Sequence, residues 1–132
     1  NVTGVQTCAL PIYVLNTILV PDLDGRVVGF GHVGDEDVDG GEPSGRGEVY
    51  GFYLHPDAWG SGAAIVLMAA CEAAMAAHFD RAVLWTLFDT PRSRRFYSKA
   101  GWTCGEGDEL LTSSWSITDD PVTVVQYRRS LR

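Results

Sequence analysis

The pattern of apolar and polar positions divides the first half of the chain into short strands. Residues 13–20 and 26–33 are mostly apolar and rich in β-branched side chains, a composition typical of strands. The sequence DLDG at 22–25 between them is a turn signal, so the two segments are expected to form a hairpin. A third strand is predicted over 48–54, and Pro56 then ends regular pairing because it has no N–H.

The central part of the chain has the pattern of a helix followed by another strand. Residues 62–78 are apolar almost all round, which predicts a helix buried against a sheet. The run AVLWTLF at 82–88 is nearly continuous in its apolar character, as expected of a strand that is covered on both faces. The strand at 48–54, this helix and this strand therefore predict a right-handed crossover unit.

The last third of the chain predicts a second helix and two further strands. Asp89 or Thr90 is expected to cap a helix that reaches about Ala100, with Gly101 in the left-handed position after it. Strands over 103–115 and 122–129 should pair antiparallel around a turn at 119–121. The predicted fold class is α/β, with a mixed sheet flanked by helices and no sign of a second domain.

Composition and charge narrow the classes of partner. The chain has 132 residues and 45% hydrophobic content, which is enough for one domain with a core. Its formal net charge of −7 argues against nucleic acid or an anionic membrane as the main partner. Three cysteines without metal-ligand spacing indicate a reducing, cytoplasmic compartment.

The acidic loop after the second strand gives no metal site. Asp35, Asp37, Asp39 and Gly40 match the opening of a calcium-binding loop, but Arg46 stands where its last carboxylate ligand is needed. We therefore predict a solvated loop and no metal.

The first residues resemble a technical sequence. Residues 2–12, VTGVQTCALPI, are similar to an in-frame translation of a common sequencing-adapter oligonucleotide over eleven consecutive positions. Because of this resemblance, we expect residues 1–12 to be non-native and the native domain to span residues 13–132. The alternative is an ordinary N-terminal strand.

The stretch between the third strand and the long helix predicts a phosphate site. Gly60 and Gly62 stand just before the helix, whose first N–H groups lack partners at the positive end of the dipole. Ala63 and Ala64 replace the Lys and Ser or Thr of a nucleotide P-loop, and Ile65 replaces the third glycine of a dinucleotide fingerprint. A different phosphate ligand is therefore indicated.

The residues WGSGAA at 59–64 resemble the acetyl-CoA motif of the GNAT superfamily of N-acyltransferases. That motif is Arg or Gln, two residues, Gly, one residue, then Gly or Ala, and Trp59 departs from its first position. The order of predicted elements fits a GNAT domain that lacks its first strand and first two helices, over about residues 18–129. The resemblance implies acetyl-CoA as co-substrate, with its pyrophosphate on the glycine turn and its pantetheine arm along residues 52–54.

A second stretch, DTPRSRRFYSKAGW at 89–102, resembles another GNAT signature, in which Asn-x-Arg-Ala precedes Phe-Tyr and Gly-Phe. Thr90 stands at the Asn position and Arg92 at the Arg position. The cofactor-binding residues implied by the two resemblances are Phe52, Tyr53, Leu54, Trp59, Gly60, Ser61, Gly62, Ala63, Ala64, Thr90 and Arg92. Arg92, Arg94, Arg95 and Lys99 also form a local cation patch, which suits phosphates or a solvated helix face.

The resemblance also implies catalytic residues. Tyr97 would be the general acid that protonates the leaving thiolate, and Glu48 would be the general base, directly or through water. Alternatively, Tyr97 packs on the sheet and Glu48 is a solvated residue at a strand end; His55 is a rival base. By the two-residue period of a strand, Tyr50 and Phe52 share the face of Glu48 and would line the acceptor side.

The implied function is transfer of an acetyl group from acetyl-CoA to a primary amine on a small molecule or peptide. No nucleic acid and no membrane is expected as a partner, and a homodimer is compatible with the resemblance. One alternative is a CoA-binding domain without turnover, because the helices that wall the acceptor site in the family are missing. Another is a plain structural domain.

Overall fold

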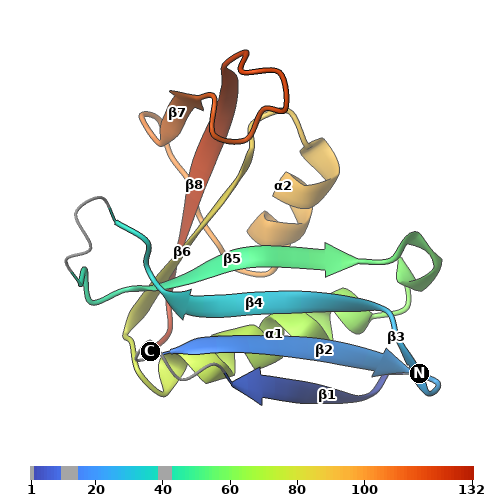
Figure 1. The fold of residues 1–132 in the computed structure, drawn as a ribbon. Coiled ribbons are helices and arrows are strands. Elements are labelled where there is room, and N and C mark those ends of the chain that lie inside the picture. Colours follow the sequence, from blue (N-terminus) through green and yellow to red (C-terminus); the bar gives the residue numbers. More distant parts are fainter. Residues whose placement is uncertain (1, 10–14, 39–42) are drawn as a thin grey trace. The chain divides into compact units, whose positions relative to one another are not determined.

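In the computed structural model the chain forms two compact units (Figure 1). The first unit comprises residues 1–82 with 130–132, and the second comprises residues 83–129. The structure describes residues 2–9, 15–38 and 43–132. Strands and helices follow one another as the sequence predicts, so the α/β fold class is confirmed.

The first unit contains an antiparallel sheet of strands with the order β1-β2-β4-β5. Its strands are β1 (Val2–Ala9), β2 (Asn16–Leu23), β4 (Gly29–Asp35) and β5 (Gly47–Leu54), and a short β3 (Arg26–Val27) pairs with β2. The predicted hairpin is confirmed, because β2 pairs antiparallel with β4 and the turn between β2 and β3 holds Asp24 and Gly25 at φ 52° and 83°.

Strand β1 lies where the sequence resembles an adapter and where the first strand of the domain was expected to be missing. It pairs antiparallel with β2 and stands at one end of the strand order. An open sheet edge accepts any extended segment, so this pairing does not decide whether residues 1–12 are native. Their exclusion from the native domain stays a prediction, and residues 10–14 lie outside the described part of the chain.

A β-bulge interrupts the pairing of β4 with β5. His32 is the partner of Gly51 and Val33 is the partner of Val49, so Tyr50 is the extra residue on β5. Beyond the bulge the inward and outward positions of β5 are exchanged relative to a regular strand.

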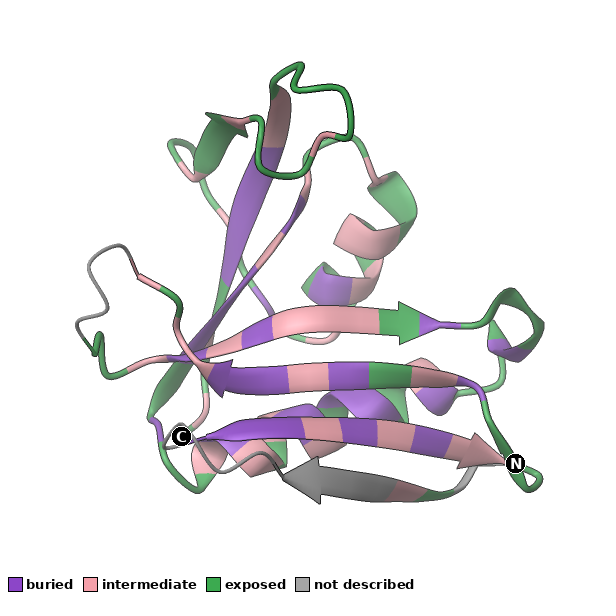
Figure 2. Ribbon diagram, viewed as in Figure 1, coloured by how far each residue is buried: buried purple, intermediate pink, exposed green. Residues whose placement is uncertain are grey.

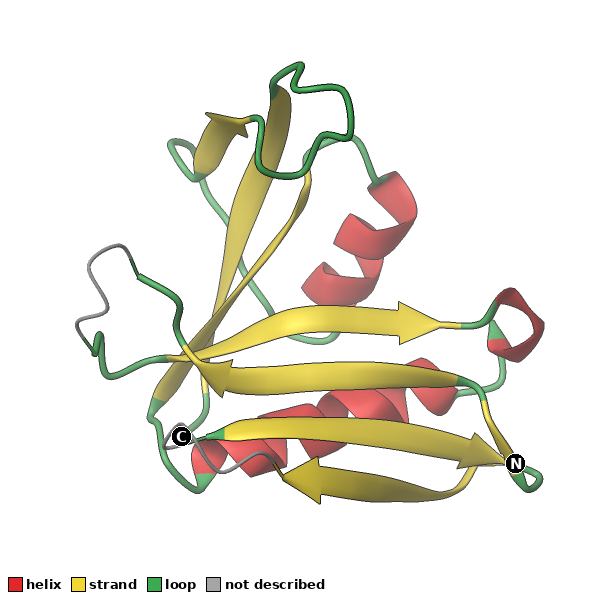
Figure 3. Cartoon of the chain, viewed as in Figure 1, coloured by secondary structure: helices red, strands yellow, loops and turns green. Residues whose placement is uncertain are grey.

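Helix α1 (Ala63–Ala76) lies along one face of this sheet (Figures 1 and 3). It buries one stripe of side chains, and Figure 2 shows the buried positions of the sheet; the stripe consists of Ala63, Leu67, Met68, Cys71 and Met75. The prediction of a helix buried against a sheet is confirmed, although Ile65 and Val66 are 68% and 41% exposed. Alanine contributes little apolar area, so a run of alanines does not by itself require cover on every side.

The second unit contains β6 (Arg81–Leu87), which begins in the first unit, then α2 (Pro91–Lys99), β7 (Glu109–Thr112) and β8 (Val122–Ser130). β7 and β8 pair antiparallel as predicted. The predicted strand over 103–115 is too long. Only Thr103 and residues 109–112 pair with β8, and glycines at 105 and 107, the latter at φ 85°, break the segment between them.

The ends of α2 follow the predicted signals in their backbone. Thr90 is the N-cap residue, Pro91 is the first helical residue, and Gly101 has φ 99° just after the helix. Thr90 does not cap with its side chain, because its Oγ1 donates to the Leu87 carbonyl at 2.7 Å. Among the described residues, neither helix has the length and apolar character that crossing a lipid bilayer would require.

Candidate functional site

The connection from β5 to α1 is a turn with two left-handed glycines. β5 ends at Leu54, a single 3-10 turn spans Pro56–Ala58, and α1 begins at Ala63. Gly60 has φ 80° and Gly62 has φ 89°, a region that other residues adopt only with strain. A Cβ at either position would meet open space, so glycine is needed for the backbone conformation and not for room.

Ser61 organises the N–H groups at the start of α1. Its hydroxyl donates to the Ala58 carbonyl and accepts the Ala63 N–H at 3.2 Å. The next N–H groups of the first turn have no carbonyl partner within the helix, and they stand at the positive end of its dipole. This arrangement suits a phosphate or pyrophosphate group.

Trp59 has a structural role at the position where the family motif has Arg or Gln. Its indole Nε1 donates to the Leu54 carbonyl at 2.9 Å, which ties the glycine turn to the end of β5. Leu54 itself is buried in a small core with Val28, Ala58 and Ala63. The indole is 47% exposed, so part of the ring remains at the surface beside the turn.

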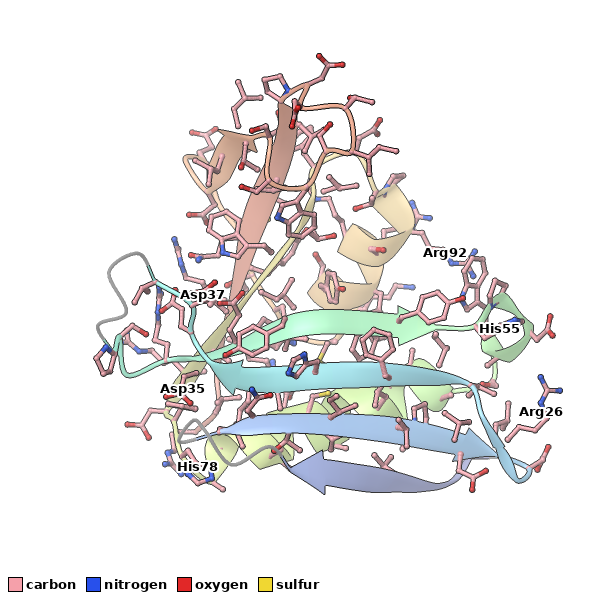
Figure 4. The ribbon with its side chains drawn as sticks, in the orientation of Figure 1. Arg26, Asp35, Asp37, His55, His78 and Arg92 are labelled. Atoms are coloured by element: carbon pink, nitrogen blue, oxygen red, sulfur yellow. The ribbon has the colours of Figure 1, made fainter. Side chains whose placement is uncertain are left out.

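His55 caps the 3-10 turn. Its Nδ1 accepts the Asp57 N–H at 3.1 Å. An imidazole whose Nδ1 already accepts a hydrogen bond is less suited to remove a proton with that nitrogen. Figure 4 shows His55 beyond one end of β5, whereas Asp35 and Asp37 lie near the other end of the β4–β5 pair.

Glu48 lies at that other end, near the start of β5. Its Oε1 accepts the Asp37 N–H at 2.9 Å. Burial, with contributions from the charges of Glu36 and Asp37, raises the pKa of Glu48 to about 7 against the opposing effects of the Asp37 hydrogen bond and Arg46. A carboxyl group with such a pKa is ionised in a large fraction of molecules near neutral pH and is a stronger base than usual.

Arg46, whose positive charge lowers the pKa of Glu48, is paired with another carboxylate. Arg46 donates from Nε and Nη2 to the two oxygens of Glu36, at 2.8 and 2.7 Å. Burial alone would raise the pKa of Glu36, but the hydrogen bonds from Arg46 and Ser44 and the charge of Arg46 lower it. The charged groups around Glu48 therefore have a negative net charge.

A polar cluster that the sequence did not reveal lies beside Glu48 on the sheet. His32 Nε2 is 2.7 Å from Asn16 Oδ1, and the ring of Tyr50 meets the His32 ring edge-on at 4.9 Å. The Tyr50 hydroxyl donates to the Asp35 carbonyl. The available signal was the presence of Asn16 and His32 within otherwise apolar strands, which shows that these positions are special but not that they meet.

The prediction that Phe52 shares the face of Glu48 is wrong. Phe52 is the partner of Gly31, and a Cβ on Gly31 would collide with Cys71 of α1, so both positions face the helix. The bulge at Tyr50 exchanges the two faces, and Tyr53 takes the outward position that a regular strand would give to Phe52.

The remaining predicted site residues, Thr90, Arg92 and Tyr97, belong to the second unit. Tyr97 is 8% exposed, and its ring packs against Phe96 and Tyr127 at centroid distances of 5.6 and 5.7 Å. Burial, with a contribution from Tyr127, raises the pKa of Tyr97 to about 12. The phenol therefore keeps its proton at neutral pH and can act as a hydrogen-bond donor.

The cation patch on α2 divides into one structural arginine and several exposed charges. Arg94 donates to the Tyr127 hydroxyl at 3.0 Å and to the Phe88 carbonyl at 3.1 Å, and its guanidinium lies over the Phe88 ring at 4.7 Å. Arg92 is exposed (Figure 4). An open groove of about 490 Å³ lies on this unit, lined by Phe88, Asp89, Pro91, Arg94, Arg95, Ser98, Lys99 and Tyr127.

Comparison with known proteins finds a family model and solved structures that are similar to this chain. Residues 11–102 match the model of the "Acetyltransferase (GNAT) family". Among curated proteins, none matches the sequence. The fold is similar to that of an N-acetyltransferase from Staphylococcus aureus Mu50, with a TM-score of 0.72 and 20% identity over 89% of this chain and 68% of that one.

Two further solved structures are similar at the level of the fold. One is a proposed acetyltransferase from Salmonella typhimurium determined with acetyl-CoA, with TM-score 0.70, 18% identity, and 89% of this chain matched to 65% of that chain. The other is a ribosomal-protein-alanine N-acetyltransferase from Brucella melitensis, with TM-score 0.70, 19% identity, and coverages of 87% and 68%. The chain thus spans about two thirds of the length of the structures that it matches.

Proposed function

The chain belongs to the acetyltransferase (GNAT) family, and we propose that it transfers the acetyl group of acetyl-CoA to a primary amine. The observation that carries this proposal is the glycine turn at the start of α1, where Gly60 and Gly62 adopt left-handed conformations directly before the helix N-terminus, at the position of the family's acetyl-CoA motif. The similar Salmonella typhimurium protein was determined with acetyl-CoA, which supports the same ligand here.

In the proposed reaction the amine nitrogen attacks the thioester carbonyl, the carbon–sulfur bond breaks, and CoA leaves as a thiolate. The turn from Trp59 to Ala64 holds the pyrophosphate through backbone N–H groups. Backbone groups of residues 52–54 position the pantetheine arm, and the resemblance to the family signature assigns a cofactor-binding role to Thr90 and Arg92 of the second unit. The amine must lose its extra proton for attack, and Glu48 takes that proton, directly or through water.

Tyr97 assists the departure of the thiolate by hydrogen bonding. Its pKa of about 12 exceeds the value of about 8.5 that is usual for a thiol. Full proton transfer from Tyr97 to the thiolate would therefore be uphill by roughly 5 kcal/mol at about 1.4 kcal/mol for each pKa unit. A hydrogen bond that strengthens as charge develops on sulfur has no such cost, and solvent then supplies the proton.

The cofactor placement is tested at Ile65, which is 68% exposed in the first turn of α1. Ile65→Glu puts a negative charge beside the proposed pyrophosphate site, and Ile65→Gln is a control of the same shape without charge. Repulsion over roughly 7 Å corresponds to a 3- to 50-fold weaker affinity for acetyl-CoA in Ile65→Glu than in Ile65→Gln, measured by calorimetry.

The effect on the fold should have the opposite sign. An acidic residue in the first turn of a helix stabilises it by about 0.3–1 kcal/mol. Weaker binding by a variant of equal or higher stability cannot come from unfolding. Equal affinity in the two variants would show that acetyl-CoA does not bind at this turn.

Turnover is tested by thiol release from acetyl-CoA with a panel of primary amines. Release that depends on the amine supports the acetyltransferase. Binding of acetyl-CoA with no release for any amine would identify the chain as a CoA-binding domain instead.

A further inference from the structure

The face of the β4–β5 pair that points away from α1 carries a row of aromatic and acidic positions. We call it the outer face, and it consists of Phe30, His32, Gly34, Glu48, Tyr50, Gly51 and Tyr53. Within the first unit α1 covers the opposite side of the sheet, and no described helix of this unit covers the outer face (Figure 1). Phe30 and Tyr53 are 40% and 49% exposed.

Two glycines make the aromatic rings of the outer face lie along the sheet. A Cβ on Gly34 would collide with the Tyr50 ring and hydroxyl, and a Cβ on Gly51 would lie 3.1 Å from the Phe30 ring. The side chains of Tyr50 and Phe30 therefore extend over the backbone of the neighbouring strand. The Phe30 and Tyr53 rings are 6.3 Å apart and tilted. We call the surface formed by the Phe30, Tyr50 and Tyr53 rings the apolar floor; Phe30 and Tyr53 remain partly exposed on it.

The strand register orders this floor relative to the carboxylate. The cross-strand pairs are Phe30 with Tyr53, His32 with Gly51, and Gly34 with Glu48. Along β4 successive pairs are two residues apart, so Glu48 lies about 13 Å along the strands from the Phe30–Tyr53 pair. The Tyr50 ring, which contacts His32, lies between them.

The charges around this floor are complementary to a cation. Glu36, Asp37 and Arg46 act on Glu48 from the loop between β4 and β5, and Arg46 is paired with Glu36. On β4 the neighbouring polar groups are His32 and Asp35, and Asp35 Oδ1 accepts the Leu15 N–H at 2.8 Å. One end of the outer face is therefore acidic, whereas the other end is aromatic.

We propose that the outer face binds the acceptor, and that the acceptor is a hydrophobic primary amine without a carboxylate. Its ammonium group pairs with Glu48, and its apolar chain lies over Tyr50 toward Phe30 and Tyr53. This inference rests on the proposed function for the reaction, but it concerns the class of acceptor alone. Contacts of an ammonium group and its first methylenes with aromatic rings add to the ion pair.

The test is a set of straight-chain ligands titrated into the 132-residue chain and followed by NMR. The amines are ethylamine, butylamine, hexylamine and octylamine, each compared with the alcohol and the carboxylate of equal length. Affinity for the amines should rise about 2- to 4-fold per methylene, the upper figure being that of full burial, and level off once the chain passes the Phe30–Tyr53 pair. The alcohols should bind at least about 5-fold more weakly, and the carboxylates more weakly still.

Three variants separate the parts of the proposed site. Glu48→Gln should reduce amine affinity to that of the alcohols and remove its rise with pH near 7. Tyr53→Thr should weaken hexylamine by about 3-fold or more while leaving ethylamine unchanged. Leu111→Thr is the matched control, because Leu111 is a 65% exposed strand residue of the second unit; it should change neither.

Each contrary result has a distinct meaning. Alcohols that bind as well as amines, an affinity that does not depend on chain length, or an equal loss in Leu111→Thr would overturn the inference. Thiol release with amines of every length at similar KM would overturn it while leaving the proposed function in place. Absence of any acetyl-CoA affinity would instead remove the proposed function, and the alkylamine titrations would still decide the chemistry of the outer face.

Discussion

The environment of Glu48 makes a prediction about stability that does not depend on any ligand. The variant Glu48→Gln keeps the shape of the side chain and an oxygen that can accept the Asp37 N–H, but it does not titrate. In the folded wild type the pKa of Glu48 is about 7, against an ordinary value of 4.5. At about 1.4 kcal/mol for each pKa unit, this difference corresponds to roughly 3 kcal/mol as an upper limit.

The sign follows from the number of protons bound. Between pH 4.5 and about 7 the folded state holds the Glu48 proton more tightly than the unfolded state does. The stability of the wild type should therefore fall as the pH rises through this window and stay low above it. The variant should lack this part of the pH dependence, so its stability relative to wild type should rise by about 2–3 kcal/mol between pH 4 and pH 8.

Urea unfolding of both proteins at several pH values measures this difference. Other titrating groups, including Glu36, are present in both proteins and cancel to first order. Glu106→Gln is the control for the chemical change, because Glu106 is an exposed residue of the second unit. Parallel stability curves for wild type and Glu48→Gln would refute the reasoning, since they would show that Glu48 is neither desolvated nor unusually basic.

Two further predictions concern Tyr97 and the first residues. Tyr97→Phe keeps the buried ring, so it should lower kcat for thiol release about 10- to 100-fold with little change in KM for acetyl-CoA or in stability; a raised KM with intact kcat would make Tyr97 a cofactor-binding residue. Deleting residues 1–12 should change the free energy of unfolding in urea by less than about 1 kcal/mol, and a larger loss would show that β1 is part of the native fold.

Features fixed by local backbone chemistry could be predicted from the sequence. The turn at 22–25 and the starts of both helices were readable because glycine and proline restrict the conformations that a segment can adopt. Gly60 and Gly62 indicated the candidate phosphate site for the same reason, since their left-handed φ angles are costly for other residues. In each case a few neighbouring residues determine the backbone conformation, so the sequence of the segment was enough to predict it.

The bulge at Tyr50 could not be predicted, although it decides which side chains flank Glu48. The sequence EVYGFYL is favourable for a strand at almost every position, and a regular two-residue period fits it well. The extra residue is visible only in the pairing with β4, which is a non-local property. The error about Phe52 follows from it, whereas Tyr50 keeps the face of Glu48 that the two-residue period gives it.

The roles of the arginines on α2 were also beyond local reasoning. Arg92, Arg94 and Arg95 are the same residue type on one short helix, so the sequence does not distinguish their roles. Arg94, however, donates a hydrogen bond to the hydroxyl of Tyr127, which is 33 residues away in the sequence. Side-chain contacts between distant segments separate a structural arginine from exposed ones. In the same way, the hydrogen bond between Asn16 and His32 depends on the register of β2 with β4.

The raised pKa of Glu48 both destabilises the fold and makes its carboxylate a stronger base. An alkylammonium group has a pKa of about 10.4, so transfer of its proton to a carboxylate of pKa 4.5 would be uphill by roughly 8 kcal/mol. With the pKa of Glu48 at about 7, the same transfer is uphill by roughly 5 kcal/mol. The gain of about 3 kcal/mol equals the amount by which ionised Glu48 destabilises the fold, because both arise from desolvation of the same charge. A substitution that exposes the Glu48 carboxylate to water should therefore stabilise the protein above pH 7. It should weaken Glu48 as a base to the same extent.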